Sequence, residues 1–323
     1  MSAFLLRAIG VLLMLTALAV ALSRAPDRTV ESLVARWAPP PSDFVDVGGQ
    51  IVHLRDEGPR QDPAPLVLLH GTAASLHTWE GWVKGLRTHK RVITLDLPGF
   101  GLTGPFGGRY APDDYRGDTL ARFVIDVLDR LQVQRFAVGG NSMGGEIAWR
   151  VASLAPARVD RLILVDASGT MFTPESMPLG FWMARIPVLN RLGEHLLPRA
   201  LVTQGLVNTY GHPERVTAEL VDRYYELALR DGNRRALGLR AQQLERGEHV
   251  ARIAALKLPT LILWGGRDRL IPPPVGVELQ RLIAGSQLVT FPELGHVPHE
   301  EDPAATLPAV RSFLGLPETP AAR

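Results

Sequence analysis

The sequence predicts an α/β fold with a mostly parallel, doubly wound sheet. Short, wholly apolar runs recur along the chain and end in turn residues, as at Leu66–Leu69, Val92–Leu95 and Leu162–Val165. Such runs are typical of parallel strands that are covered on both faces. Segments with apolar residues at helical spacing lie between them, as at about 113–131. Alternating strands and helices build a parallel sheet with helices on both faces.

The composition suits a large α/β domain and argues against several kinds of site. Apolar residues make up 46% of the 323, and the formal net charge is only +2. No basic run or stripe appears, so we expect no nucleic acid partner. The chain has no cysteine, which excludes disulfides, thiolate nucleophiles and cysteine-ligated zinc. Its histidines show no metal-ligand spacing, and we expect neither a metal nor another cofactor.

An apolar segment precedes the predicted domain. The run from Ala8 to Leu22 is uncharged, and when it is extended back across Arg7 it is barely long enough to span a bilayer. We expect residues 1–23 to be a single helical membrane anchor. The alternative is an export signal that is cleaved near Ser23.

The segment 24–42 ends in three prolines and is expected to be a linker. Phe44–Val47 and Gln50–Arg55 then flank two glycines, which predicts a β-hairpin. His53 alternates with apolar neighbours in this hairpin, so we expect its side chain on the strand surface. The α/β core is predicted to cover 43–166 and 259–315, with a tail at 316–323.

Residues 167–258 interrupt the alternation of strands and helices. They show helical patterns and no clear strand, and they follow a strand at the edge where open α/β sheets bind ligands. This predicts a helical cap over the site. Several large apolar residues are expected to line a substrate pocket there, together with one residue near the end of the chain: Met171, Phe172, Phe181, Trp182 and Val297.

The frame Gly140-x-Ser142-x-Gly144 follows an apolar run that ends at Val138, and a helical pattern starts at once. A serine on so tight a turn has strained backbone angles, and glycines beside it remove collisions with the strand and the helix. This strand–turn–helix arrangement is typical of a nucleophile elbow. It predicts that Ser142 is a catalytic nucleophile.

Over about residues 43–315 the chain resembles the α/β-hydrolase superfamily. The resemblance rests on four motifs in order: His70-Gly71, Gly140-x-Ser142-x-Gly144, Gly266-Arg267-Asp268 and Gly295-His296. It implies an α/β-hydrolase fold with an eight-stranded sheet and a helical cap insertion. It also implies a catalytic triad in the chain order Ser, Asp, His.

Each predicted triad member has a chemical role. A serine hydroxyl is a poor nucleophile at neutral pH and needs a base, for which His296 is the candidate. An acid must orient the imidazole, and Asp268 is preferred for this role. Asp166 is the alternative acid, because some members of the superfamily carry the acid one strand earlier.

The tetrahedral intermediate of acyl transfer carries a negative charge on the former carbonyl oxygen. The resemblance places its two donors in the main chain, at the residue after the nucleophile and at the loop after the first parallel strand. These are the backbone N–H groups of Met143 and Thr72.

We therefore expect a serine hydrolase that cleaves carboxylic esters of an apolar small molecule or lipid through an acyl-enzyme. The elbow Asn141–Gly145 is also similar to that of the meta-cleavage carbon–carbon bond hydrolases, which is the alternative reaction. Those enzymes usually have tryptophan where this chain has Val297. A third alternative is a ligand-binding, receptor-like member of the superfamily with negligible turnover.

Overall fold

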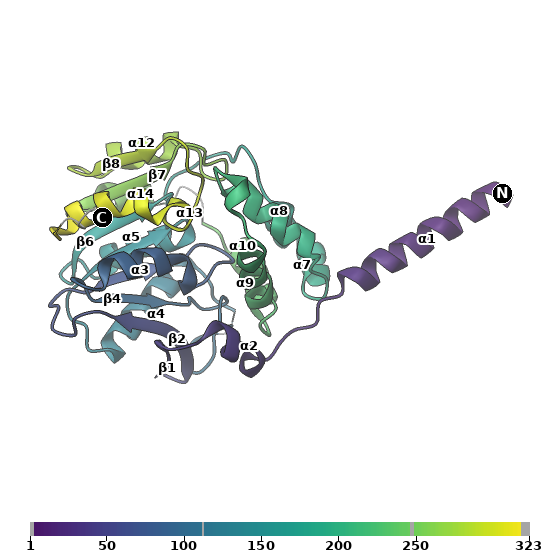
Figure 1. Ribbon diagram of the computed structural model, residues 1–323, viewed down its shortest axis with the longest axis horizontal. Helices are drawn as coiled ribbons and strands as arrows, with labels where there is room; N and C mark the ends of the chain where they lie inside the picture. The colour runs from purple at the N-terminus through teal and green to yellow at the C-terminus, as the bar shows by residue number, and fades with distance from the viewer. Residues whose placement is uncertain (1–2, 112, 246–248, 318–323) are drawn as a thin grey trace, which may run out of the picture.

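The computed structural model describes residues 3–111, 113–245 and 249–317. Most of the tail predicted at 316–323 lies outside these residues. At the centre is an eight-stranded sheet with the strand order β1-β2-β4-β3-β5-β6-β7-β8 (Figure 1). The strands are β1 (Ser42–Val47), β2 (Gln50–Glu57), β3 (Leu66–Leu69), β4 (Val92–Leu95), β5 (Phe136–Asn141), β6 (Val159–Val165), β7 (Thr260–Gly265) and β8 (Gln287–Phe291).

The pairing of the strands confirms the predicted fold class. Strands β1 and β2 form an antiparallel hairpin, and β2 pairs antiparallel with β4. All other neighbours pair in parallel. Gly48 and Gly49 both have positive φ and make the two-residue turn of the predicted hairpin.

Helices cover both faces of the sheet. They are α3 (Glu80–Leu86), α4 (Gly117–Arg130), α5 (Met143–Leu154), α12 (Pro274–Leu282), α13 (Pro298–Glu301) and α14 (Pro303–Leu314). Val67 and Leu69 of β3 belong to the apolar cluster under α4, α5 and α12, whereas Leu66 and Leu68 belong to the cluster under α3 and α14. Successive side chains of a strand point to opposite faces of the sheet, so each wholly apolar strand contributes to the apolar cluster on both faces.

Within the described residues, six α-helices lie between β6 and β7, in the segment predicted to be a cap. They are α6 (Leu179–Ala184), α7 (Pro187–Gly193), α8 (Arg199–Thr209), α9 (Ala218–Ala228), α10 (Asn233–Gln242) and α11 (Val250–Ala254). Figure 1 shows α7 to α10 standing together beside the sheet. We refer to residues 167–258 as the cap segment.

The segment 24–42, predicted to be a linker, contains helix α2 (Val30–Trp37). Leu33 and Trp37 of this helix are buried against Leu102 and Leu227. The helix has no clear signal in the sequence, because eight residues offer too few turns for a recognisable period.

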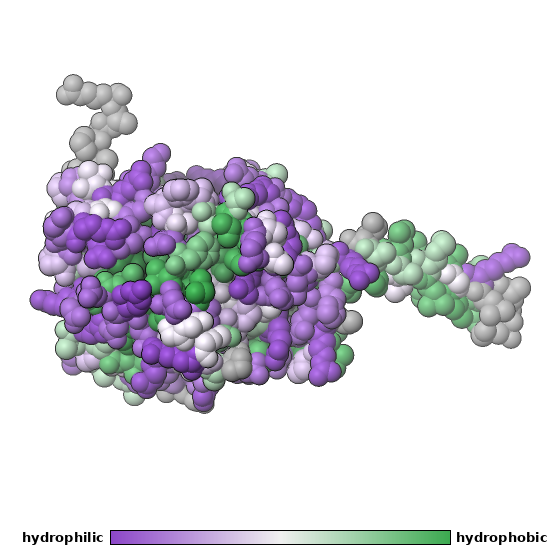
Figure 2. Space-filling view, turned by 90° about the horizontal axis from the view of Figure 1, so that it is seen from below, coloured by the Kyte–Doolittle hydropathy of each residue, from purple (hydrophilic) through white to green (hydrophobic). Residues whose placement is uncertain are grey.

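Helix α1 (Ala3–Ser23) extends away from the rest of the chain (Figure 1), and apolar surface runs along it (Figure 2). Within the described residues, however, no helix combines the length and the hydropathy that a bilayer span needs. The prediction of a membrane anchor at residues 1–23 is therefore wrong, and the membrane is not supported as a partner. Arg7 limits the uncharged run to Ala8–Leu22, which rises about 22 Å as a helix and falls short of a hydrocarbon core of about 30 Å.

Candidate active site

Ser142 lies at a sharp turn between β5 and α5. Its φ of 55° and ψ of −116° are costly for a residue other than glycine. A Cβ atom on Gly140 would overlap the backbone of Gly144, and one on Gly144 would overlap the carbonyl of Leu69. The Ser142 N–H donates to the Val165 carbonyl at 3.0 Å, which ties the strained turn to β6. The elbow glycines are thus required by the closeness of strand and helix.

Asp268 follows β7 and His296 follows β8, and the structure brings the two together. His296 Nδ1 and Asp268 Oδ2 are 2.7 Å apart, and both residues are buried. The other Asp268 oxygen accepts hydrogen bonds from the backbone N–H groups of Leu270 and Ile271, at 2.8 and 3.0 Å. These two donors fix the carboxylate so that it can accept the Nδ1–H of the imidazole. With Nδ1 bound in this way, Nε2 is the ring nitrogen that is left for proton transfer.

Asn141 connects the histidine loop to the elbow. Its side-chain amide donates to the carbonyl of His296 at 2.9 Å and to that of Val165 at 3.2 Å. The backbone of His296 is therefore held against the residue that precedes Ser142. From the cap segment, the Thr209 carbonyl accepts the His296 N–H at 2.7 Å. A contact between the Ser142 hydroxyl and the His296 imidazole stays a prediction.

Met143 and Thr72 lie close to Ser142 on two different elements. Met143 is the first residue of α5, so its N–H is among the first four, which have no acceptor within a helix. Thr72 follows Gly71, where an added Cβ atom would lie 3.3 Å from the Cβ of Ser142. The loop after β3 thus approaches the serine closely, while the role of both N–H groups stays a prediction.

His70 is buried beneath this loop. Its Nδ1 lies 2.8 Å from the carbonyl oxygen of Gly71, and its Nε2 accepts the backbone N–H of Leu97 at 2.9 Å. Burial lowers the pKa of His70 and keeps the ring neutral. Because both ring nitrogens are occupied, His70 holds the loop in place and has no nitrogen left for proton transfer.

Asp166, the alternative acid, lies at the end of β6 with a φ of 44° and is fully buried. One of its oxygens accepts the Gly265 N–H at 2.9 Å. As a carboxylate, its Oδ2 would have no hydrogen-bond donor within the described residues, but as a carboxylic acid it donates to Asp268. Burial, and then the negative charge of Asp268, raise the pKa of Asp166 well above its usual range.

Asp166, Asp268 and His296 offer side-chain oxygen and nitrogen atoms that all lie within 4.8 Å of one another. This is a donor set that could hold a small cation. The hydrogen bond between Asp268 and His296 already uses one atom of each.

The predicted pocket residues are dispersed. Met171 and Trp182 are exposed, and Phe181 is half-buried. Phe172 packs against the main apolar core, and Val297 is buried beside the catalytic candidate His296. Because apolar residues of a cap can also pack against one another, the pattern alone did not separate core from pocket.

A second hydrogen-bonded set of serine, histidine and aspartate links the β-hairpin, which contains Ser42 and His53, to Asp96 at the end of β4. Ser42 Oγ is 3.0 Å from His53 Nε2, and His53 Nδ1 is 2.7 Å from Asp96 Oδ2. His53, expected on the strand surface, is fully buried. Ser42 stands at the start of a strand and its oxygen accepts a hydrogen bond from Arg55 Nε at 3.0 Å. This set lacks a strained elbow and ties β1 and β2 to the sheet.

The comparisons with known proteins show which family this fold belongs to. The family model described as the alpha/beta hydrolase fold matches residues 64–303. The chain belongs to the α/β-hydrolase fold family.

Relatives of this α/β-hydrolase carry out different reactions. A 2-hydroxy-6-oxononadienedioate/2-hydroxy-6-oxononatrienedioate hydrolase from Escherichia coli is 30% identical over 280 residues, which are 82% of this chain and 91% of that protein. The acetyltransferase component of the acetoin cleaving system of Pseudomonas putida is 30% identical over 263 residues; these are 80% of this chain and only 65% of that protein. The solved structure of a bacterial membrane phospholipase A matches with a TM-score of 0.69 and 26% identity, covering 97% of this chain and 95% of that one.

The family and these relatives show that the protein is a hydrolase, which is against the receptor-like alternative. A small-molecule substrate is consistent with this family. The nature of the bond that is cleaved differs among the relatives.

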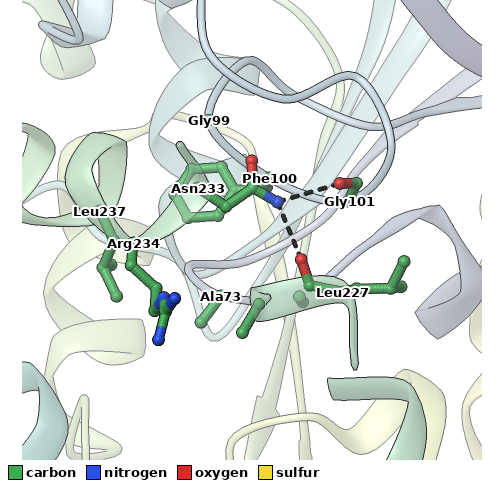
Figure 3. A pocket seen from close by; sticks show the side chains of 10 residues that line it. Ala73, Gly99, Phe100, Gly101, Leu227, Asn233, Arg234 and Leu237 are labelled. Carbon is green, nitrogen blue, oxygen red and sulfur yellow. Dashed lines mark hydrogen bonds between the residues drawn. The ribbon is translucent and has the colours of Figure 1, made fainter. Parts of the chain in front are cut away.

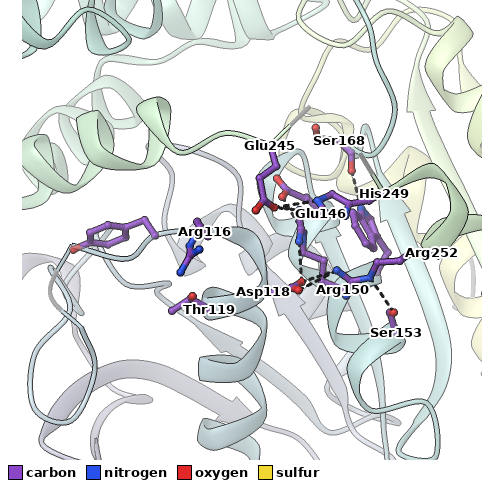
Figure 4. Close-up of polar contacts among 12 residues, drawn as sticks. Arg116, Asp118, Thr119, Glu146, Arg150, Ser153, Ser168, Glu245, His249 and Arg252 are labelled. Atoms are coloured by element: carbon purple, nitrogen blue, oxygen red, sulfur yellow. Dashed lines mark hydrogen bonds and ion pairs between the residues drawn. The ribbon is translucent and has the colours of Figure 1, made fainter. Parts of the chain in front are cut away.

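Sequence reasoning missed a buried ion network beside α5 of this hydrolase (Figure 4). Arg150 pairs with Glu146, Asp118 and Glu245 at 3.0, 2.8 and 2.8 Å. Arg240 of the cap segment also pairs with Glu146. The spacing of Glu146 and Arg150 by four residues is a helical pair visible in the sequence, but the partners from other elements carry no local signal.

Proposed function

We propose that this hydrolase cleaves carboxylic esters of an apolar small molecule or lipid, with Ser142, His296 and Asp268 as its catalytic triad. The observation that supports this most is the buried hydrogen bond of 2.7 Å between His296 and Asp268, on a loop tied to the serine elbow. A serine at an elbow, a base and an orienting acid are the parts that acyl transfer needs.

In the proposed reaction His296 Nε2 takes the proton of Ser142 as its oxygen attacks the ester carbonyl. The bond between the carbonyl carbon and the serine oxygen forms, and the carbonyl oxygen becomes negative. The backbone N–H groups of Met143 and Thr72 stabilise this oxyanion. His296 then gives the proton to the departing alkoxide, which leaves an acyl-enzyme and an alcohol.

Water completes the cycle. His296 takes a proton from water, whose oxygen attacks the acyl carbon. The bond from that carbon to the Ser142 oxygen then breaks, His296 returns the proton to this oxygen, and the carboxylic acid leaves. Asp268 stays ionised throughout and stabilises the imidazolium that forms in each half-reaction. Among the solved structures, the likeness to a phospholipase A, an enzyme whose name denotes ester cleavage, supports this choice of bond.

A panel of p-nitrophenyl esters of increasing acyl chain length tests the proposal. We expect steady hydrolysis by the full chain and a loss of at least about 10⁴-fold in the Ser142→Ala variant. A fluorophosphonate should label Ser142 and no other serine, as mass spectrometry can check. If Ser142→Ala keeps wild-type activity, the proposed nucleophile is wrong.

The second candidate is hydrolysis of a carbon–carbon bond in a vinylogous diketone. The 30% identity to the Escherichia coli dienedioate hydrolase favours it. Loss of the visible absorbance of a dienol substrate, with no turnover in the ester panel, would select this reaction. The absence of tryptophan at Val297 argues for the ester first.

A further inference from the structure

A small cavity lies between the loop after β3 and the cap segment (Figure 3). Ala73 and Ala74 form one wall, and Leu237 and Arg234 of α10 form another. The cavity has a volume of about 30 Å³, which is room for roughly two or three water molecules. Ala73 is two residues from Gly71, which lies against Ser142. One short loop therefore connects this cavity to the nucleophile.

Arg234 is the unusual residue of this cavity. Only 7% of its side chain is exposed, and its Nη2 pairs with Asp27 at 2.6 Å. Its Nε and Nη1 atoms are buried and have no hydrogen-bond partner within the described residues. The buried Nε atoms of Arg223, Arg230 and Arg240 are also unpartnered there, but in the described chain no other arginine leaves two nitrogens so.

The start of α10 fixes the position of this arginine. Gly232 has a φ of 80° and caps the helix, and Asn233 begins it. The Asn233 amide donates to the carbonyls of Gly101 and Leu227 at 3.0 and 2.9 Å, as the dashed lines in Figure 3 show. Arg234 follows at the second helical position, so its backbone is held rigidly beside the cavity.

Unpartnered N–H groups of a buried guanidinium are costly, because charged donors lose more on leaving water than neutral ones. Asp27 compensates one nitrogen from a half-exposed position, with 42% of its side chain accessible. Arg234 lines this cavity together with Ala73, Ala74 and Leu237, and in such apolar surroundings a charge-assisted hydrogen bond is stronger than in water. The group that complements its Nε and Nη1 is an anionic oxygen.

We propose that the Nε and Nη1 groups of Arg234 bind an anionic oxygen group, a carboxylate or a phosphate, that the substrate carries away from its scissile carbonyl. This inference rests on the proposed function, since it places the anion in the molecule that Ser142 attacks. Arg234 is then a specificity-determining residue and takes no part in the bond changes. A substrate of this enzyme is accordingly an apolar ester with one acidic group.

Matched pairs of substrates test the carboxylate. Mono-p-nitrophenyl esters of succinic, glutaric and adipic acid are each compared with the neutral ester in which an isopropyl group replaces the free carboxylate. We expect wild type to prefer the acidic member of at least one pair. Arg234→Met should lose about 10- to 100-fold in kcat/KM for that member, as expected for hydrogen bonds to a charged group, and stay within about threefold for the neutral one.

The phosphate is tested with a second pair, a 1-acylglycerol 3-phosphate and the corresponding 1-acylglycerol. If Arg234→Met selectively loses activity toward the p-nitrophenyl esters with a free carboxylate, the site binds a carboxylate on the acyl side. If it selectively loses activity toward the 1-acylglycerol 3-phosphate, the site binds a phosphate on the alcohol side. Arg234→Lys keeps the charge with fewer donors and should fall between wild type and Arg234→Met.

Two control variants separate anion binding from folding. Arg235→Met changes the next residue, which is 62% exposed and pairs with Asp113, and should leave both members of every pair unaffected. Asp27→Asn breaks the ion pair but keeps the Arg234 donors, so the preference for acidic substrates should persist. The proposal is overturned if Arg234→Met loses the same factor in kcat/KM for acidic and neutral substrates and Asp27→Asn loses as much. Arg234 would then have a structural role only.

Binding without turnover keeps this inference separate from the proposed function. Calorimetric titration of Ser142→Ala with monomethyl succinate, glutarate and adipate, and with the 1-acylglycerol 3-phosphate, should show binding to at least one that is lost on adding Arg234→Met. Such binding supports the anion site even if no ester is hydrolysed. If no such binding is found, or if neither substrate series shows an acidic preference, Arg234 binds no anionic group of the substrate and the proposal is overturned.

Discussion

Asp166 and Asp268 are two buried carboxyl groups beside one histidine. Asp268 has two backbone donors and an imidazole, whereas Asp166 has one backbone donor and the like charge of its neighbour. Two adjacent carboxyl groups do not both ionise readily. Burial and the neighbouring Asp268 raise the pKa of Asp166, so the geometry assigns the proton to Asp166.

This assignment predicts a difference between two amide variants. Asp268→Asn removes the charge that holds the imidazole, and we expect ester hydrolysis to fall by about 10³- to 10⁴-fold. Asp166→Asn keeps a donor toward Asp268 and an acceptor for the Gly265 N–H, so activity should stay within a few-fold of wild type. Steady-state kinetics of both variants checks this, and the reverse order would make Asp166 the catalytic acid.

The raised pKa of Asp166 also predicts a pH dependence of stability. In the unfolded chain the carboxyl loses its proton near its ordinary pKa of 3.8, whereas in the folded chain it keeps the proton to higher pH. The folded state then binds more protons, so this group's contribution is complete at low pH and is lost as pH rises through the folded pKa. Urea unfolding at several pH values should show a smaller loss at high pH in Asp166→Asn than in wild type.

Ser42, His53 and Asp96 show that hydrogen bonds alone do not define a catalytic triad. The Asp96 carboxylate accepts backbone N–H groups from Leu76 and Leu102 at 2.7 and 2.8 Å, which makes it a junction between loops. We expect Ser42→Ala to keep ester hydrolysis within about threefold and Ser42 to resist a fluorophosphonate. Labelling of Ser42 in the Ser142→Ala background would contradict this.

At the scale of elements, the ion network beside α5 joins the nucleophile's helix to the cap segment. Arg240 of α10 and Arg150 of α5 both pair with Glu146, and all three side chains are buried. Removing one member of a buried pair typically costs 3–5 kcal/mol. Without Arg240, Glu146 keeps Arg150 as a cationic partner, which offsets part of that cost.

Arg240→Met should therefore lower the free energy of unfolding by more than about 1 kcal/mol and at most about 5 kcal/mol, as measured by urea denaturation. The matched control is Arg235→Met on the same helix, whose exposed ion pair contributes at most about 1 kcal/mol. Adding Glu146→Gln to Arg240→Met removes the buried charge that has lost one of its two cationic partners, and it should recover part of the loss. Equal stability of the two single variants would show that the network does not couple the cap segment to α5.

The elements that the sequence predicted best are those with the longest or purest patterns. The apolar run Leu66–Leu69 is a strand as expected, and the helix expected at about 113–131 covers Gly117–Arg130. Helix α2 was missed because it has eight residues, and His53 was misplaced because β2 is buried along most of both faces. A short helix and a strand that is buried on both faces are hard to recognise for the same reason. In each, too few positions show the difference between a buried apolar face and an exposed polar face.

At the scale of the whole molecule, the elbow and the histidine and aspartate loops could be predicted because parallel strands bring their carboxyl ends to one edge. The pairing of Arg234 with Asp27, 207 residues away, could not be predicted. It depends on how the cap segment packs against the N-terminal segment, and no local sequence pattern indicates that packing.

The N-terminal segment is part of the folded body from about Arg24 onward. The Ala25 N–H donates to the His195 carbonyl at 3.0 Å, and Trp37 Nε1 donates to Glu226 at 2.7 Å. The carbonyl of Trp37 also lies 2.8 Å from His77 Nε2. Helix α2 therefore connects the cap segment to the loop that follows β3, while α1 extends away from both (Figure 1).

Two truncations should separate the roles of α1 and α2. A chain that begins at Arg24 keeps these contacts, and its Tm should stay within about 2 °C of the full chain. A chain that begins at Pro39 loses the buried side chains of Leu33 and Trp37, which together contribute about 3–6 kcal/mol, and loses Asp27 as well. We expect a clearly lower Tm and weaker ester hydrolysis from the second chain, because Arg234 and α9 lose partners beside the cavity. If both chains melt and turn over alike, the N-terminal segment has no part in holding the cap segment over the site.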